Sequence, residues 1–412
     1  MKTIAAVAVA LALVACQRND APRPAAQALR ADGEGPAHAG RPAVRRLLLG
    51  RVVDLASLSV ERTVAEPPES EVTDTAADVG VVATRDFHVR AFKLSTGQQI
   101  WDQSPRAPCR SLQLAAGLVY AGCGDQLLAF ATTGGAPIVV DKGGAGDPIV
   151  AGALVLSPHQ DGRLSIYDAA SGKLRASKIP VELAKAFHSH VIANPAGAGA
   201  CVLGLEVGNH DRWTYRAGCY DDRLTRSWTK DLPVNVRRER LYDVRQTGPR
   251  YLVLDDQSSL ADTRAPPGPG DGLVMSWRDG SVTPFHDRTF ATLEDPRGER
   301  LHPDADVFTK TKDLVVEHEP FADREARVAG DDRRVFALIV NGATALAGVD
   351  RATGHTLFLV PLPLGALIGR FEVVEGFPIV STRFSDRWVA TVHDPATGAV
   401  AYRDSRPLAP AP

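Results

Sequence analysis

The chain has 412 residues and a formal net charge of −2 at pH 7. A charge this close to zero gives no electrostatic reason to expect nucleic acid as a partner. The length exceeds that of a usual single domain, but all-β sandwiches and propellers can run this long as one unit.

The sequence begins with a segment typical of a secretory signal peptide. Lys2 supplies a positive charge, residues 4–13 form an apolar stretch, and small residues follow before Cys16. The stretch is too short to span a bilayer, and no later apolar run approaches the roughly eighteen residues of a transmembrane helix. We therefore predict a signal peptide over residues 1–15 and no membrane-spanning helix.

The end of this segment, Leu13-Val14-Ala15-Cys16, resembles the lipobox of bacterial lipoproteins. The resemblance implies cleavage before Cys16 and lipidation of that cysteine. Gln17 follows in place of aspartate, which in the Gram-negative members of that class implies sorting to the outer membrane. The expected location is the cell envelope, lipid-anchored at the outer membrane and facing the periplasm.

Residues 16–44 are rich in alanine, proline, glycine and charged residues and contain almost no large apolar side chain. Such a composition cannot bury a core, so this segment is predicted to be a flexible tether behind Cys16.

From residue 45 onward, short runs of β-branched, leucine and aromatic residues alternate with turn residues, which predicts an all-β domain. One unit recurs: an apolar strand, a polar turn with glycine, and a second strand. Its clear copies are Ala91–Trp101, Leu128–Val140, Leu164–Leu174, Leu346–Phe358 and Val389–Tyr402, and its weaker copies are Ala217–Trp228 and Val274–Val282.

The turn glycines that anchor these copies are Gly97, Gly134, Gly172, Gly280, Gly354 and Gly398. Glycine suits turns that need a positive φ, where a Cβ would clash. Their shorter spacings equal one four-stranded unit with tight loops, which predicts a β-propeller of seven or eight four-stranded blades. The apolar segment from Leu47 to Val60 precedes the first copy, so we expect an N-terminal strand to complete the last blade and close the ring.

The pattern in Ala91–Trp101 and Leu127–Gly134 resembles the repeat of pyrroloquinoline-quinone (PQQ)-like β-propellers, over about residues 85–402. That family includes quinoprotein dehydrogenases and a lipoprotein of the outer-membrane β-barrel assembly machinery. Trp101 and Trp228 match the repeat's structural tryptophan, which the resemblance implies packs between blades. Cofactor-binding members often carry adjacent cysteines joined in a ring, and this chain has no adjacent pair, so we predict no cofactor and no enzymatic activity.

Four cysteines follow Cys16: Cys109, Cys123, Cys201 and Cys219. The midpoint of the first two is Ala116, beside Gly117, and the midpoint of the last two is His210, within a Gly-Asn-His-Asp turn. Facing residues of an antiparallel hairpin are equidistant from its turn, and an oxidising compartment permits the bond. Of the three possible connectivities we therefore predict 109–123 with 201–219.

Motifs for nucleophilic catalysis, phosphate loops and common metal sites are absent from the sequence. Weaker metal candidates are His188 with His190, which share one face of a strand, and the paired carboxylates. These carboxylates are Asp304, Asp306, Glu317 and Glu319. The carboxylates lie in a charged stretch, residues 286–334, that we expect to be an insertion in a single domain over residues 45–405, followed by a tail over residues 406–412.

The leading hypothesis is a non-enzymatic, membrane-tethered propeller that binds envelope proteins, with outer-membrane protein assembly as one process it could serve. Two alternatives stay open at this point: a PQQ- or metal-dependent oxidoreductase, and a propeller that binds a small molecule or glycan.

Overall fold

The computed structural model describes residues 44–66, 68–134, 136–194, 196–207, 212–232, 236–237, 242–246, 251–256, 272–285, 293–294, 300–301, 327–340, 344–362 and 367–407. These residues belong to one compact unit, Pro42–Pro412. The predicted signal peptide, Cys16 and nearly all of the predicted tether lie outside the described residues.

The described residues form antiparallel strands. In the first half of the chain these are β1 (Arg45–Leu48), β2 (Arg51–Asp54), β3 (Ser59–Thr63), β4 (Ser70–Asp74), β5 (Val79–Ala83), β6 (Val89–Lys93), β7 (Gln99–Gln103), β8 (Cys109–Ala115), β9 (Leu118–Cys123), β10 (Gln126–Ala131), β11 (Ile138–Asp141), β12 (Ile149–Ala151), β13 (Leu154–Pro158), β14 (Leu164–Asp168), β15 (Leu174–Lys178), β16 (Ala186–Ala193) and β17 (Gly199–Val207).

In the second half they are β18 (Arg212–Asp221), β19 (Arg226–Asp231), β20 (Val236–Arg237), β21 (Tyr242–Gln246), β22 (Tyr251–Asp256), β23 (Gly272–Ser276), β24 (Val282–Phe285), β25 (Leu293–Glu294), β26 (Arg300–Leu301), β27 (Arg327–Gly330), β28 (Arg334–Val340), β29 (Thr344–Asp350), β30 (Thr356–Pro361), β31 (Leu367–Val374), β32 (Phe377–Arg383), β33 (Arg387–His393) and β34 (Val400–Pro407).

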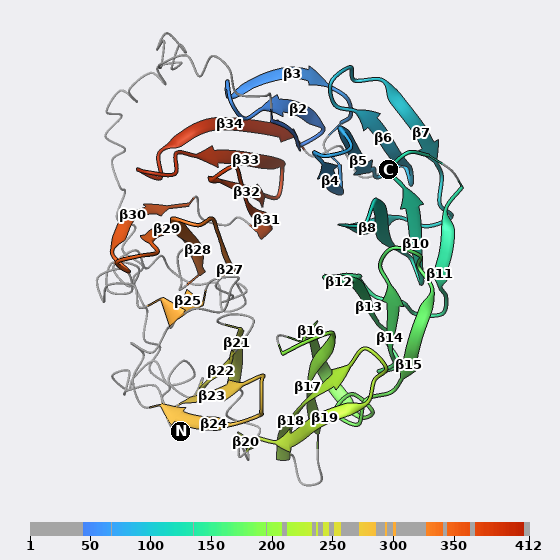
Figure 1. Cartoon of the computed structure of the whole chain (residues 1–412), viewed down its shortest axis with the longest axis vertical. Coiled ribbons are helices and arrows are strands. Elements are labelled where there is room, and N and C mark those ends of the chain that lie inside the picture. The colour runs from blue at the N-terminus through green and yellow to red at the C-terminus, as the bar shows by residue number, and fades with distance from the viewer. Residues whose placement is uncertain are drawn as a thin grey trace, which may run out of the picture. The chain divides into compact units, whose positions relative to one another are not determined.

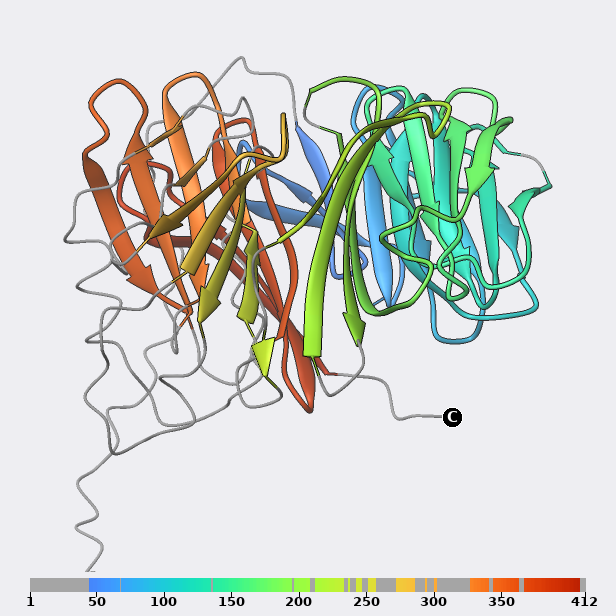
Figure 2. The same cartoon turned by 90° about the horizontal axis from the view of Figure 1, so that it is seen from below.

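Within the described part of the chain, seven sheets have a path of four strands in sequence order: β4–β7, β8–β11, β12–β15, β16–β19, β21–β24, β27–β30 and β31–β34. Figure 1 shows the sheets following one another around a common centre, and in Figure 2 the turns between strands gather at the two faces of the unit. The protein is therefore an all-β propeller, and the predicted seven four-stranded blades are confirmed. No helix long and apolar enough to cross a bilayer occurs among the described residues.

The turn glycines meet two structural requirements. All six anchors have a positive φ, between 66° and 119°. Several also lie against the outermost strand of the preceding sheet: a Cβ at Gly280 would lie 2.9 Å from Trp228, and one at Gly398 would lie 2.3 Å from Phe358. The repeat therefore needs glycine for both backbone conformation and close approach between sheets.

The tryptophan positions of the repeat lie between sheets, as the resemblance implies. Trp101, on β7, stacks on Phe130 of β10, with ring centroids 5.6 Å apart. Its indole N–H donates to the carbonyl of Thr132 at 3.2 Å. The indole of Trp228 likewise donates to the carbonyl of Trp277 in the following sheet, at 3.2 Å. The buried Trp101 and the partly buried Trp228 thus each join one sheet to the next, with the indole N–H satisfied.

The N-terminal segment corrects the predicted ring closure. The last sheet, β31–β34, is complete without it, and β1–β3 form a separate three-stranded sheet. Side chains of β1 and β2 pack on both neighbours: Leu48 and Val53 share a hydrophobic cluster with Ile379 of the last sheet, whereas Leu47 and Val52 share one with side chains of β5 and β6. Closure therefore depends on packing between sheets and not on a shared strand.

The β1–β3 sheet is an eighth repeat that lacks its innermost strand. Asp54-Leu55-Ala56-Ser57-Leu58 forms the same turn as Asp168-Ala169-Ala170-Ser171-Gly172, in which the aspartate accepts hydrogen bonds from the alanine N–H and the serine hydroxyl. Leu58 stands at the glycine position with φ 53°, and its side chain packs against the hydrophobic cluster that joins β1 and β2 to the last sheet, which we call the closing cluster. The β2–β3 hairpin thus corresponds to the two outer strands of the other sheets, and β1 corresponds to their second strand.

The structure moves two boundaries that the sequence predicted, the end of the insertion and the start of the C-terminal tail. β27 lies inside the predicted insertion and pairs with Val335–Leu338 of β28, so residues 327–334 belong to a blade. β34 continues to Pro407, so the predicted tail begins too early. Arg406 explains this extension, because its guanidinium donates to the carbonyls of Leu49 and Ala65, at 2.7 and 2.9 Å.

We expect Arg406→Met to lower the free energy of unfolding by about 2 kcal/mol, because it leaves two largely buried carbonyls without a donor. Urea titration followed by tryptophan fluorescence measures the change. Arg403→Met is the matched control, since Arg403 is exposed on the same strand. Equal stability losses in the two variants would contradict a closing role for Arg406.

Candidate functional site

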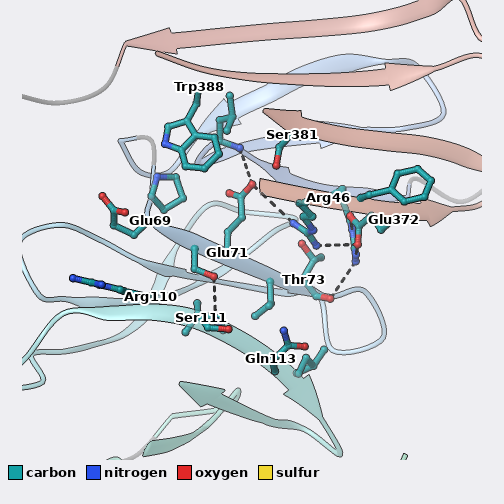
Figure 3. A pocket seen from close by; sticks show the side chains of 18 residues that line it. Arg46, Glu69, Glu71, Thr73, Arg110, Ser111, Gln113, Glu372, Ser381 and Trp388 are labelled. Atoms are coloured by element: carbon teal, nitrogen blue, oxygen red, sulfur yellow. Dashed lines mark hydrogen bonds and ion pairs between the residues drawn. The ribbon is translucent and has the colours of Figure 1, made fainter. Parts of the chain in front are cut away.

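A pocket of about 560 Å³ lies where the innermost strand of the eighth repeat is missing. Its walls come from β1, β4, β8 and β31, with Ser381 and Trp388 from the last sheet. We call it the closure pocket (Figure 3). The charged side chains that line it are Arg46, Glu69, Glu71, Arg110, Arg370 and Glu372.

Side chains of β4 replace the missing strand along the edge of β1. The Leu47 N–H donates to Thr73 Oγ1 at 3.1 Å, and the N–H groups of Leu49 and Gly50 donate to the Glu71 carboxylate at 2.8 and 3.0 Å. An unpaired strand edge is thereby satisfied without a fourth strand. The space that a fourth strand would fill is therefore lined by polar groups and is open to a small polar ligand.

Two carboxylates at one side of the pocket have pKa values shifted in opposite directions. Burial raises the pKa of Glu71, and the opposing effects of Arg370, 4.0 Å away, and of the two N–H groups are smaller. Burial also acts to raise the pKa of Glu372, but the charge of Arg370 and the bonds from Arg46 outweigh it, and the pKa is lowered. Arg46 Nε donates to Glu372 at 3.1 Å, and Arg370 Nη2 donates at 3.0 Å.

The lowered pKa of Glu372 predicts a loss of stability in acid. A group whose pKa is lower in the folded state stabilises it above the unfolded pKa, and this contribution disappears as pH falls through the folded pKa. We expect Glu372→Gln to melt below the wild-type protein at about pH 6 and to approach it at about pH 3. Glu71 has the opposite sign, so the comparison between variants, and not the wild-type profile alone, isolates Glu372.

Glu375→Gln serves as the control for this melting series, since Glu375 is exposed in the turn after β31. A gap between Glu372→Gln and wild type that stays constant with pH would exclude the titration of Glu372 as the cause.

A second polar cluster has the composition of a catalytic triad but not its geometry. His159 Nε2 lies 2.7 Å from Asp141 Oδ2 and 3.2 Å from Ser165 Oγ, so both partners meet the same nitrogen. Nδ1 faces Arg163 Nη2 at 2.8 Å, and because a guanidinium only donates, Nδ1 is the acceptor and Nε2 carries the proton. A serine nucleophile needs a free imidazole nitrogen to take its proton. This cluster instead joins β11 to the following sheet.

The predicted site residues divide into three groups. The structure contains both disulfides, Cys109–Cys123 and Cys201–Cys219, each between directly opposed residues of neighbouring strands. His188 and His190 lie on β16, where His190 is exposed; the side chain of His188 lies outside the described residues. Asp304, Asp306, Glu317 and Glu319 also lie outside them. No group of three metal-ligating side chains occurs among the residues that the structure describes.

Sequence reasoning missed the closure pocket. Its charged residues come from four strands that are distant in sequence, and none belongs to a recognisable motif. One signal was available: Asp54-Leu55-Ala56-Ser57 repeats the turn chemistry of Asp168-Ala169-Ala170-Ser171. Reading that turn as a repeat would have placed an incomplete blade beside the first complete one.

Comparisons with known proteins give similarity of structure only. No protein-family model matches the chain, and no curated protein matches it. Among solved structures, the computationally designed protein Ika8 is 12% identical, covers 81% of this chain and 85% of its own, and has a TM-score of 0.43. BamB from Moraxella catarrhalis is 11% identical, with 81% of this chain and 89% of that chain covered and a TM-score of 0.41.

The β-propeller domain of Cps50 (Swd1) from Myceliophteria thermophila is 15% identical, with 58% of this chain and 79% of that chain covered and a TM-score of 0.35. Similarities at this level assign no function to the chain.

Proposed function

We propose that this protein is a lipid-anchored β-propeller of PQQ-like repeat type that binds partner proteins in a bacterial cell envelope and catalyses no reaction. Cys16 carries the lipid and tethers the propeller to the outer membrane, on its periplasmic side. The Leu-Val-Ala-Cys sequence supports the anchor, and the two disulfides support an oxidising compartment. The partners are other envelope proteins, with outer-membrane protein assembly as the process served.

The observation that carries the binding role is an exposed apolar surface on two neighbouring outermost strands. Ile138 and Val139 of β11 are 50% and 46% exposed, and Leu174 of β15 is 58% exposed. Val140 lies 3.4 Å from the Cβ position of Gly172, in the turn that leads into β15, so the two strands are close. We call Ile138, Val139 and Leu174 the rim patch. Exposed apolar groups on adjacent edge strands offer both burial and free backbone groups to a partner.

The charge around the rim patch favours an acidic partner. Lys142, Lys173 and Lys178 are exposed beside it and make no ion pair within the described residues. Lys178 lies on the edge strand β15, and Lys142 and Lys173 adjoin the ends of β11 and β15. Their charges repel a second copy of the same edge, which disfavours self-association. The same charges attract an acidic protein surface and speed its association.

The test is affinity capture from solubilised envelope of the source bacterium, with the full-length protein as bait. We expect envelope proteins to be retained by the wild-type protein and lost with the double variant Val139→Asp/Leu174→Asp, because two carboxylates remove the apolar surface. Val400→Asp is the matched control, as Val400 is 51% exposed on the outermost strand of the last sheet.

Two results would count against the proposal. One is capture of no envelope protein above the level of bare resin by the wild-type bait. The other is retention of the same partners by the double variant, which would move the binding surface elsewhere.

A further inference from the structure

The acidic groups of the closure pocket are already engaged. Glu69 is paired with Arg85, outside the pocket, and Glu71 accepts two backbone N–H groups. Glu372 is held between Arg46 and Arg370. Buried acceptors that have their donors offer little to a ligand. The carboxylates of the pocket therefore do not call for a bound cation.

Two arginines of the closure pocket have N–H groups that make no hydrogen bond among the described residues. Arg110 is exposed and makes no hydrogen bond or ion pair among the described residues, so its whole guanidinium is available. Arg370 Nη1 is buried without a hydrogen-bond partner and lies 4.0 Å from Glu71 Oε1. A guanidinium has no acceptor capacity, so the unused hydrogen-bonding capacity of these two side chains calls for an anionic ligand.

The backbone presents Arg110 in an unusual way. Cys109 pairs with Cys123 and Ser111 pairs with Gly122, which leaves Arg110 as the extra residue of a β-bulge on β8. Bulges redirect a side chain and are over-represented beside functional sites. The Cys109–Cys123 disulfide fixes the strand immediately before the bulge, and the Leu112 N–H donates to Ser70 Oγ at 3.0 Å just after it. Both sides of the bulge are thus held in place.

Figure 3 shows Arg110 at one side of the pocket and the Arg46–Glu372 pair at the other. Gln113 and Ser111, on the same strand as Arg110, add an amide and a hydroxyl to the lining, and Trp388 adds an aromatic surface. A pocket of about 560 Å³ is in the range that holds a small molecule.

We propose that the closure pocket binds a small organic acid, with a carboxylate of the ligand held by Arg110. Arg–carboxylate pairs are planar and bidentate, which suits a single guanidinium presented at a fixed angle. The site is separate from the rim patch, so it does not depend on the proposed binding of partner proteins.

The experiment is isothermal titration calorimetry of the full-length protein with citrate as the probe, in buffers of equal ionic strength of about 0.15 M. We expect citrate to bind and Arg110→Gln to weaken binding at least about tenfold. Arg106→Gln should leave it unchanged, because Arg106 is an exposed arginine four residues away that does not line the pocket. Inorganic phosphate should bind more weakly than citrate, because it lacks a planar carboxylate.

Melting of Arg110→Gln at the wild-type temperature will show that its effect is on binding, as expected for an exposed side chain. The proposal is overturned if citrate gives no binding heat up to about 50 mM. It is also overturned if Arg110→Gln binds citrate as the wild-type protein does, if Arg106→Gln loses as much affinity, or if phosphate binds as tightly as citrate.

Discussion

Replacing Cys201 and Cys219 together with alanine will lower the free energy of unfolding by roughly 3 kcal/mol. The two residues are separated by 18 positions and face each other across β17 and β18, where both are buried. Without the bond, the unfolded chain regains the freedom of that loop, while the folded sheet keeps its strand pairing. Equilibrium urea unfolding of the oxidised protein and of the double variant measures the difference.

The double variant Cys109→Ala/Cys123→Ala is the natural comparison, with a sequence separation of 14. Loop-closure entropy predicts a similar loss for it, again roughly 3 kcal/mol. A loss below about 0.5 kcal/mol in both variants would mean that residual strand pairing already restricts the unfolded chain, and loop-closure entropy would then not be the source of the stabilisation.

Gly204→Ala will destabilise the β16–β19 sheet by about 3 kcal/mol, because a Cβ has no room there. It would lie 1.8 Å from the carbonyl oxygen of Glu182 and 3.1 Å from the Cβ of Ala186. The clash involves backbone, so relief requires the segment at Glu182 to move. That segment carries the buried Glu182 carboxylate, which accepts hydrogen bonds from the hydroxyls of Tyr220 and Thr229, each at 2.5 Å.

Gly197→Ala is the matched control, since no atom lies within 4 Å of its Cβ position. Thermal melting should show a large drop for Gly204→Ala and a change near zero for Gly197→Ala. Equal melting temperatures would show that the Glu182 segment moves aside without loss of stability.

Repetition made much of the fold predictable. The turn glycines recur because each of these turns has a positive φ and several of them also lie against the outermost strand of the preceding sheet, so a local requirement appears again from copy to copy. The sequence pattern did not reveal the N-terminal repeat, because there a leucine takes the place of the turn glycine. Leu58 adopts the positive φ and contributes its side chain to the closing cluster. The predicted closure was wrong for this reason, since the segment around Leu58 was not recognised as a repeat.

The hairpin geometry of the cysteines was predictable, but one detail was not. The turn at Ala116 and Gly117 pairs Ala115 with Leu118, a register that alone would not bring Cys109 opposite Cys123. The bulge at Arg110 supplies the missing residue. A bulge changes pairing without any fixed sequence pattern, so midpoint reasoning found the right pair and overlooked the residue that makes it possible.

The sequence by itself determined the all-β propeller, its repeat turns and the pairing of the four cysteines, because these depend on residues close together in the chain. Only the tertiary structure decided how the ring closes and where the closure pocket lies. Arg46, Arg110 and Arg370 line this pocket from three different sheets, and their surroundings depend on a strand that the eighth repeat does not have. Such a site arises from packing between distant segments, and the one local sign of it, the Asp54-Leu55-Ala56-Ser57 turn, indicates the incomplete repeat but not the residues that line the pocket.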